Sequence, residues 1–350
     1  MNVPTLGVNC VKIITFGFLT IIDMRISVFV PQYGVIEAVT PPFRTFNTAN
    51  EILTASGKKP IFEVEYVGLS ENVPANNGEY VIKTDRLLKD VVKTDLLIIP
   101  PAYGDTAKGV KANAEALPYF KKLHDGGCSV ASLCLGAFLL AETGLLNGKK
   151  CSTHWAHIHE FRERYPNVEV EDGAIITAHG NIYSSGGASS LWNLILYLVE
   201  KFADRETAVT VSKYFALDIG RDNQSQFAIF KGQRKHGDDD IQKVQDHIEK
   251  NYCNRILTDN LAALIHSSRR TFERRFKNAT NNTTSEYLQR VRIEAAKTLF
   301  EASRKNVSEI MYDVGYTDMR TFRNTFKKIA GLSPIEYRTR FAKASHEVRK

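Results

Sequence analysis

The sequence predicts two domains of different fold class. The first is an α/β domain with a flavodoxin-like layered, mostly parallel sheet, and the second is an all-α domain with two helix-turn-helix units. Strand-like and helix-like segments alternate over residues 11–215, as in layered α/β folds. Only helical patterns follow in residues 239–343, after a polar linker at residues 216–238. Residues 239–350 carry a net charge of +8, whereas the preceding 238 residues carry −1.

Short apolar runs of the first domain are typical of strands buried on both faces of a parallel sheet. These runs are residues 11–16, 61–67, 96–100 and 128–133. Helical patterns occupy residues 113–124, 135–143, 155–165 and 186–202, and a hairpin is predicted at residues 174–185 around His179, Gly180 and Asn181. The apolar residues 13–22 are too few to span a bilayer and lack the flanks of a signal peptide. We interpret them as part of the first strand.

The five cysteines are scattered: Cys10, Cys128, Cys134, Cys151 and Cys253. None forms a Cys-x-x-Cys pair, so the pattern indicates neither a zinc site nor a disulfide framework. Reduced thiols are typical of the cytoplasm. We expect no metal site, and we separately expect no cofactor.

The second domain repeats one pattern, a helix, a tight turn and an Arg-rich helix, at residues 258–279 and 306–330. An amphipathic helix at residues 241–252 precedes the first unit, and a long helix opened by Thr283 and Glu286 joins the two. Helix starts are predicted at capping residues, and Gly315 is predicted at the second turn. The capping residues are Thr258, Ser268, Asn306 with Glu309, Asp318, and Ser333 with Glu336.

Each Arg-rich helix has an aromatic inner face, Phe272 with Phe276 and Phe322 with Phe326. A basic helix packed in this way can enter the major groove of DNA, which is about 12 Å wide. The alternative is a basic helical bundle in which the arginines only form a solvent-exposed face and bind no DNA. Two similar units in tandem favour DNA binding over that alternative. The outward residues are Arg269, Arg270, Glu273, Arg274, Met319, Arg320, Thr321, Arg323 and Asn324.

Residues 241–341 resemble the DNA-binding domain of the AraC/XylS family. The resemblance is carried by residues 307–334, including Gly315-Tyr316, Phe322, Phe326 and Gly331-Leu332-Ser333-Pro334. It implies base-edge contacts from the outward residues of both helices, in two adjacent turns of the major groove about 34 Å apart. The sequence departs from the family at His266, where a small residue is usual, and at residues 281–284, which replace Gly-x-x-Pro. Asn tolerates a left-handed backbone, so we expect the fold to survive.

Cys134 follows a predicted strand and precedes Gly136, Ala137 and a helix. A nucleophile elbow has this shape, and the helix N-terminus beside it would lower the pKa of a thiol. His154 could serve as a base. A structural or ligand-contacting thiol is the competing interpretation, and one Cys with a distant His favours it.

Residues 11–215 resemble the class I glutamine amidotransferase-like domain of PfpI-type proteins, through residues 130–146, 151–155 and 184–187. Fusion to an AraC-type domain is the arrangement of GlxA-like regulators, and residues 224–227 also match them. Enzymes of this superfamily place a Glu in the first helix near the Cys, whereas Ser27 falls at the corresponding place here. The resemblance therefore favours a pocket reused for ligand binding, at the carboxyl ends of the strands near Cys134, His154 and Trp155.

Two functional hypotheses follow. The first is a cytoplasmic, nucleoid-associated transcription regulator of bacterial type, which binds double-stranded DNA and is modulated by a small metabolite in the α/β domain. The resemblance implies a homodimer, no membrane partner, RNA polymerase as a further candidate partner, and amino acids or quaternary amines as candidate effectors. The alternative is a Cys-dependent hydrolase or amidotransferase-like enzyme with an accessory DNA-binding domain. A fold does not by itself determine a function. The absence of the expected Glu at the position of Ser27 favours the regulator, for which we expect no catalytic residues.

Overall fold

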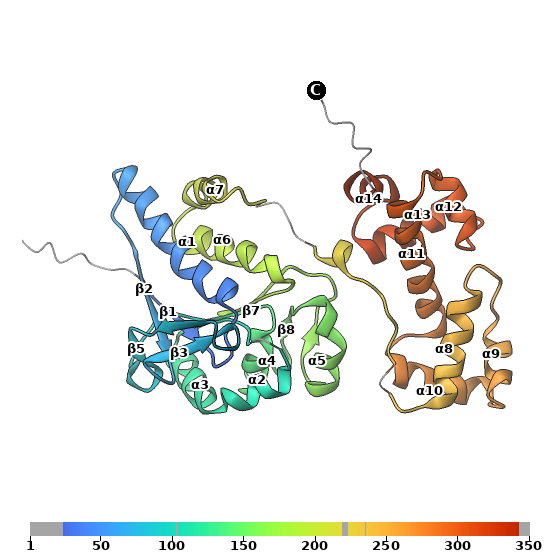
Figure 1. Cartoon of the computed structure of the whole chain (residues 1–350), viewed down its shortest axis with the longest axis horizontal. Helices are drawn as coiled ribbons and strands as arrows, with labels where there is room; N and C mark the ends of the chain where they lie inside the picture. Colours follow the sequence, from blue (N-terminus) through green and yellow to red (C-terminus); the bar gives the residue numbers. More distant parts are fainter. Residues whose placement is uncertain (1–23, 103, 219–222, 235, 343–350) are drawn as a thin grey trace, which may run out of the picture.

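The computed structural model describes residues 24–102, 104–218, 223–234 and 236–342. Figure 1 shows an α/β body followed by a body made of helices, with a connecting segment between them. The fold classes of both parts agree with the prediction from sequence. No helix within these described ranges combines the length and apolarity needed to cross a bilayer.

A seven-stranded sheet forms the centre of the α/β body, in the order β10-β11-β7-β6-β1-β2-β5. Its neighbouring strands are parallel, except that β10 and β11 form the antiparallel hairpin predicted around Gly180. Two small sheets pair β3 with β4 and β8 with β9. The strands are β1 (Met24–Val30), β2 (Phe62–Gly68), β3 (Asn72–Ala75), β4 (Tyr80–Lys83), β5 (Arg86–Leu87), β6 (Leu96–Ile99), β7 (Ser129–Leu133), β8 (Lys150–Cys151), β9 (Glu169–Val170), β10 (Ile176–His179) and β11 (Ile182–Ser185).

Helices cover both faces of this sheet, which explains why the central strands read as continuous apolar runs. One face packs against α1, α6 and α7, and the other against α2, α3, α4 and α5 (Figure 1). All four side chains of β6 are buried. The helices are α1 (Ile36–Ala55), α2 (Thr106–Ala112), α3 (Leu117–Asp125), α4 (Gly136–Glu142), α5 (Ile158–Arg164), α6 (Leu191–Phe202) and α7 (Arg205–Tyr214). Short 3-10 turns are η1 (Asn76–Gly78), η2 (Leu88–Asp90), η3 (Ala114–Ala116), η4 (Trp155–His157) and η5 (Ala188–Ser190).

Three details of the sequence prediction need correction or fall outside the structure. The strand predicted at residues 11–16 lies outside the described residues, and the first described strand is β1, which the apolar pattern did not single out. The helix predicted from residue 186 begins as α6 at Leu191, because the Gly186-Gly187 pair is followed by the turn η5. Thr258 does not cap the next helix; Leu257 holds the N-cap position without a side-chain hydrogen bond.

The helical body contains two small cores that share α11. The first core joins α8, α9 and α10 to the start of α11, and the second joins α12, α13 and α14 to its end. Each core therefore supports one helix-turn-helix unit. The helices are α8 (Asp239–Asn251), α9 (Thr258–Leu264), α10 (Arg269–Thr280), α11 (Thr284–Ala302), α12 (Val307–Asp313), α13 (Met319–Ala330) and α14 (Pro334–Phe341).

Local capping fixes most helix starts in this body, as predicted. Thr283 with Glu286, Asn306 with Glu309, and Ser333 with Glu336 form complete capping boxes. Each box satisfies backbone N–H groups that a helix leaves without partners at its start. The starts of these helices are therefore encoded by local sequence.

Candidate nucleic-acid interface and sensor site

The first Arg-rich helix, α10, presents a polar face to solvent. Ser268 caps its start by accepting a hydrogen bond from the Thr271 N–H at 3.3 Å. The rings of Phe272 and Phe276 are fully buried. Arg270, Glu273 and Arg274 consequently lie on the exposed side of the same helix. The helix ends at Asn281, which has a left-handed φ of 53°, as expected for the Asn that replaces the usual Gly.

Two arginines of α10 already have carboxylate partners within the protein. Arg275 turns toward α8, where its guanidinium donates to Asp238 at 2.7 and 3.0 Å and to Asp240 at 3.2 Å. This pair fixes α10 against the start of α8 and removes Arg275 from the exposed face. Arg269 is exposed and bonds Glu273 at 3.0 Å, so both side chains would have to exchange this contact for one with DNA. Sequence reasoning missed the role of Arg275, although the Asp238-Asp239-Asp240 run was the available signal.

The second Arg-rich helix, α13, has the same construction. Asp318 caps it by accepting the Thr321 N–H at 2.7 Å, and Gly331 ends it with a φ of 74°. Phe322 and Phe326 are fully buried. The outward residues Arg320, Thr321, Arg323 and Asn324 are exposed, and Met319 is half-buried at the start.

The helices α10 and α13 lie toward opposite ends of α11 (Figure 1). This helix has 19 residues, which corresponds to a length of about 28 Å at 1.5 Å per residue. A spacing of this order is compatible with the predicted reading of two successive turns of DNA. Among the described residues no ion pair involves Arg270, Arg274, Arg320 or Arg323, so these guanidinium groups remain available for phosphates or bases.

Cys134 occupies a strained turn between β7 and α4, as the elbow pattern predicts. Its φ is 54°, a left-handed value that is uncommon for a residue with a side chain. The turn brings the α4 start so close to β6 that a Cβ at Gly136 would overlap the Ile99 carbonyl oxygen. Cys134 is only 6% exposed. The turn therefore has the geometry of an elbow, but the side chain is covered.

The structure does not give Cys134 the lowered pKa expected of a thiol at a nucleophile elbow. Burial raises the pKa of Cys134 to about 12, which outweighs the expected lowering by the helix N-terminus. Burial also lowers the pKa of His154, whose Nδ1 accepts the Ala156 N–H at 3.2 Å. Within the described part of the chain no hydrogen bond joins the Cys134 thiol to this ring.

The prediction that Ser27 occupies the place at which related enzymes carry a Glu in the first helix was wrong. Ser27 lies in the middle of β1, fully buried, and its Oγ donates to Glu65 at 2.9 Å. It is a strand residue rather than a position at the first helix. The acidic residue in the first turn of α1 is Glu37, whose carboxylate accepts from Asn76. The described residues provide no carboxylate hydrogen bond to Cys134.

The three residues predicted to bind a ligand come from two adjoining segments. Thr153 donates its Oγ1 to the Cys134 carbonyl at 3.2 Å, which places the turn before η4 against the elbow. His154 and Trp155 follow, with ring centroids 5.4 Å apart and both side chains half-buried. The structure thus brings the Cys134 backbone next to this turn.

A cleft of about 770 Å³ between the two bodies lies beside these residues. Trp155, His159 and Asp172 of the α/β body line it, opposite Arg290 and Lys297 of α11. The Arg290 guanidinium lies 3.6 Å from an Asp172 carboxylate oxygen across the cleft. The cleft shares Trp155 with the predicted ligand residues, and no sequence motif signalled it.

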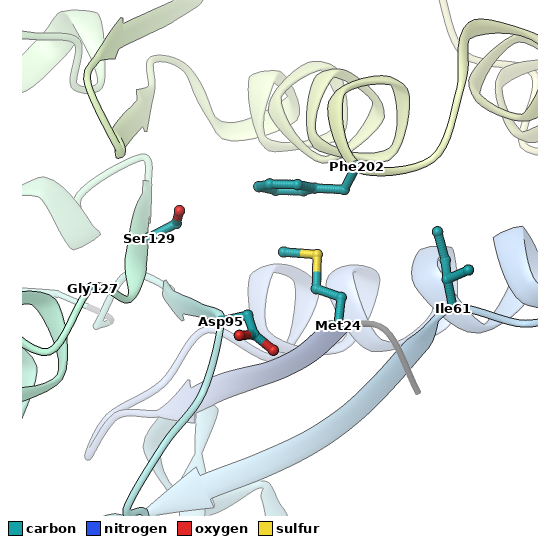
Figure 2. A pocket seen from close by; sticks show the side chains of 6 residues that line it. All are labelled: Met24, Ile61, Asp95, Gly127, Ser129 and Phe202. Carbon is teal, nitrogen blue, oxygen red and sulfur yellow. The ribbon is translucent and has the colours of Figure 1, made fainter. Parts of the chain in front are cut away.

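A second cavity, of about 440 Å³, lies at the opposite edge of the sheet (Figure 2). Figure 2 shows Met24 below the Phe202 ring, with Asp95 and Ser129 beside them. Met24 and Ser129 begin their strands, so this cavity faces the amino ends. Ligand sites of parallel sheets lie at the carboxyl ends, which favours the Cys134 side as the sensor site.

Alkylation of the native protein is expected to distinguish Cys134 from Cys253. Burial raises the pKa of Cys134 to about 12, so little of this thiol is ionised between pH 7 and 9, and the thiolate is the reactive form. Cys253 is exposed and serves as an internal control. Peptide mass spectrometry after iodoacetamide treatment between pH 7 and 9 should find Cys253 modified and Cys134 largely unmodified. Equal rates at both cysteines would revive a chemical role for the elbow thiol.

Comparison with known proteins agrees with this geometry. A model described as DJ-1/PfpI family matches residues 32–201, and one described as a helix-turn-helix domain matches residues 261–340. The chain is 28% identical over 269 residues to the HTH-type transcriptional regulator CdhR of Pseudomonas aeruginosa, covering 76% of this chain and 78% of CdhR. It is 24% identical over 213 residues to GbdR of the same species, covering 61% of this chain and 58% of GbdR. Identity to GlxA of Rhizobium meliloti is 22% over 235 residues, covering 63% of this chain and 68% of GlxA.

The fold and the two exposed helices define a helix-turn-helix DNA-binding regulator of transcription. Its homologues are named as HTH-type transcriptional regulators. More specifically, the chain joins a DJ-1/PfpI-family domain to an AraC-type helix-turn-helix domain, which is the GlxA-like combination.

Proposed function

We propose that this protein is a cytoplasmic transcription regulator that places α10 and α13 in two adjacent major-groove turns of duplex DNA and responds to a small metabolite. The observation that carries the proposal is the pair of exposed polar faces, each supported by its own buried aromatic core. The proposed base-contacting residues are Arg269, Arg270, Glu273, Arg274, Met319, Arg320, Thr321, Arg323 and Asn324. Because the two faces differ in residue type, each site on DNA would be asymmetric.

The metabolite would bind at the carboxyl edge of the sheet, near Cys134, His154 and Trp155. Trp155 offers a ring to a quaternary amine, and charged groups of the neighbouring cleft could pair with an amino acid. The buried, poorly ionised Cys134 supports a binding role over a catalytic one. A homodimer through the α/β domain is part of the proposal, as the family resemblance implies.

Arg274→Ala and Arg320→Ala test the DNA-binding half of the proposal. An operator is first selected from a randomised duplex pool with the full chain, and affinities are then measured by fluorescence anisotropy over a range of salt concentrations. Each variant should lose about 1–3 kcal/mol of binding free energy, because each removes a base or phosphate contact. Arg255→Ala, an exposed arginine between α8 and α9, is the control for the lost charge. Affinities and salt slopes equal to wild type in both test variants would disprove the interface.

The sensor half is tested by thermal denaturation with the twenty proteinogenic amino acids, glycine betaine and choline. A compound that binds only the folded state at 100 times its Kd stabilises it by about 2.7 kcal/mol. The same compound should change operator affinity. If none of these compounds moves either the melting temperature or the operator affinity, the proposed effector class is wrong.

A further inference from the structure

The buried side chain of Gln224 anchors the segment after α7 on the α/β body. It is only 1% exposed. Its Oε1 accepts the Gly187 N–H at 2.7 Å, and its Nε2 donates to the carbonyls of Thr153 at 3.0 Å and Ala174 at 3.1 Å. Its own backbone N–H donates to the Gly173 carbonyl at 2.7 Å. Both the oxygen and the nitrogen of this buried carboxamide have hydrogen-bond partners. Such a fully hydrogen-bonded buried group fixes the position of the segment that carries it.

Two glycines of the α/β body leave the space that this segment occupies. A Cβ at Gly186 would overlap the Gln224 carboxamide, and a Cβ at Gly173 would overlap the Ser225 hydroxyl. Gly173 also has a φ of 81°, which side chains disfavour. Both partners therefore fit this contact. The two loop glycines of the α/β body leave space for it, and the segment fills that space with the Gln224 carboxamide and the Ser225 hydroxyl.

The same amide lies next to the proposed sensor site. The Thr153 residue that accepts from Gln224 through its carbonyl also donates its Oγ1 to the Cys134 carbonyl at 3.2 Å. His154 and Trp155 follow directly in the chain. A ligand that displaces this turn must therefore also displace an acceptor of Gln224.

The neighbouring residues of the segment contact the helical body. Asn223 lies against Gly331 at the end of α13, where a Cβ would be 3.1 Å from the Asn223 Oδ1. The 3-10 turn η6 (Ser225–Phe227) follows, and its Phe227 ring packs edge-on against Phe341 at 5.8 Å. Further along, the Phe230 N–H donates to Glu294 of α11 at 3.1 Å. One short stretch thus touches the elbow turn on one side and the end of the second DNA-facing helix on the other.

We propose that Gln224 is the coupling residue that transmits occupation of the elbow site to α13. This inference rests on the proposed function, since it specifies how the sensor site would regulate DNA binding. A ligand can shift an equilibrium only through an element that both sites contact. Residues 223–227 meet that requirement, because a move of Thr153 changes the hold on Gln224 and thereby the position of Asn223 beneath Gly331. Gln224 acts here as a positioning residue and contacts neither DNA nor the effector.

The direct test is hydrogen–deuterium exchange of the full chain without effector, in wild type and Gln224→Met. Methionine keeps the volume beside Gly186 but can make none of the three side-chain hydrogen bonds. The Gly187 amide reports release of the segment, and the amides of residues 327–331 report the effect on α13. Both are expected to exchange about tenfold faster or more, the factor that follows from losing roughly one hydrogen bond of local stability. Gln242→Met on α8 is the matched control and should leave both unchanged.

Faster exchange at Gly187 without any change at residues 327–331 would overturn the coupling, as would unchanged exchange at both. Gly186→Ala provides a second route if Gln224→Met folds poorly. The added methyl would displace the Gln224 carboxamide from its place beside Gly186. Exchange at the Gly187 amide and at residues 327–331 is then expected to rise as in Gln224→Met.

A second arm separates this inference from the proposed function. It uses whichever amino acid or quaternary amine raises the wild-type melting temperature and alters operator affinity. In Gln224→Met that compound should still raise the melting temperature, while the ratio of operator affinities with and without it falls to about one. An unchanged ratio would disprove the coupling through Gln224 but not the proposed function as a transcription regulator. If no compound acts on wild type, the effector proposal fails and the exchange result alone decides the coupling.

Discussion

Phe326→Ala is expected to unfold the second helix-turn-helix unit without unfolding the α/β body. The Phe326 ring is fully buried and meets Phe300, Phe322 and Tyr337 at centroid distances of 5.5 to 5.8 Å. These partners come from α11, α13 and α14, so one ring joins three helices of a small core. Truncating a buried Phe to Ala costs about 3–5 kcal/mol, much of the stability of a small domain.

Two optical signals separate the bodies in this experiment. The chain has two tryptophans, Trp155 and Trp192, and both belong to the α/β body. Tryptophan fluorescence therefore reports mainly on that body during urea denaturation, with a contribution from the cleft toward α11 that Trp155 lines, whereas far-ultraviolet circular dichroism follows both bodies. Phe326→Ala should produce an early loss of helical signal at unchanged fluorescence midpoint, and operator affinity should fall by more than Arg320→Ala alone causes. Tyr312→Ala, an exposed aromatic on α12, is the control and should leave both midpoints in place. Coincident, unshifted transitions in Phe326→Ala would show that the core does not depend on this ring.

The parts of the fold that local chemistry decides could be predicted from the sequence. Ser268, Asp318 and the three capping boxes mark helix starts because each cap and its partner N–H lie within three residues of one another. The β10–β11 hairpin follows from a Gly turn between two short strands. Thr258 shows the limit of this reasoning, since the capping position moved to Leu257 and no side-chain hydrogen bond formed.

Properties that depend on distant contacts could not be predicted. The inward turn of Arg275 depends on Asp238, 37 residues earlier, and the docking of Gln224 depends on Thr153, 71 residues earlier. The elbow at Cys134 was visible as a pattern, but its raised pKa comes from burial, which the pattern does not contain. The same holds for Ser27, whose place in the middle of β1 is decided by which apolar run pairs with β2 and β6.

Gly136→Ala is expected to have the converse effect and destabilise the α/β body alone. The added methyl would overlap the Ile99 carbonyl oxygen and lie 3.1 Å from the carbonyl oxygen of Pro100. Both atoms are backbone, so no side-chain rotation can relieve the contact. Overpacking costs about 1–3 kcal/mol, and an obstacle that cannot rotate away places this variant at or beyond the upper end. We expect a clear fall in the fluorescence midpoint with little change in the helical body.

The functional consequence follows from where Gly136 lies. It begins α4 two residues after Cys134, so pushing α4 away from β6 displaces the elbow and the Thr153 turn hydrogen-bonded to it. The cores beneath α10 and α13 contain no residue of the α/β body, so both helices should stay folded. A change in operator affinity without effector is expected only through the contact of the Thr153 turn with Gln224. The melting-temperature response to the active amino acid or amine should be lost. Gly126→Ala, where the nearest atom would be 3.3 Å away, is the control and should keep that response. A Gly136→Ala protein with a wild-type fluorescence midpoint and a full response would mean that the close approach of α4 to β6 is not what shapes the sensor site.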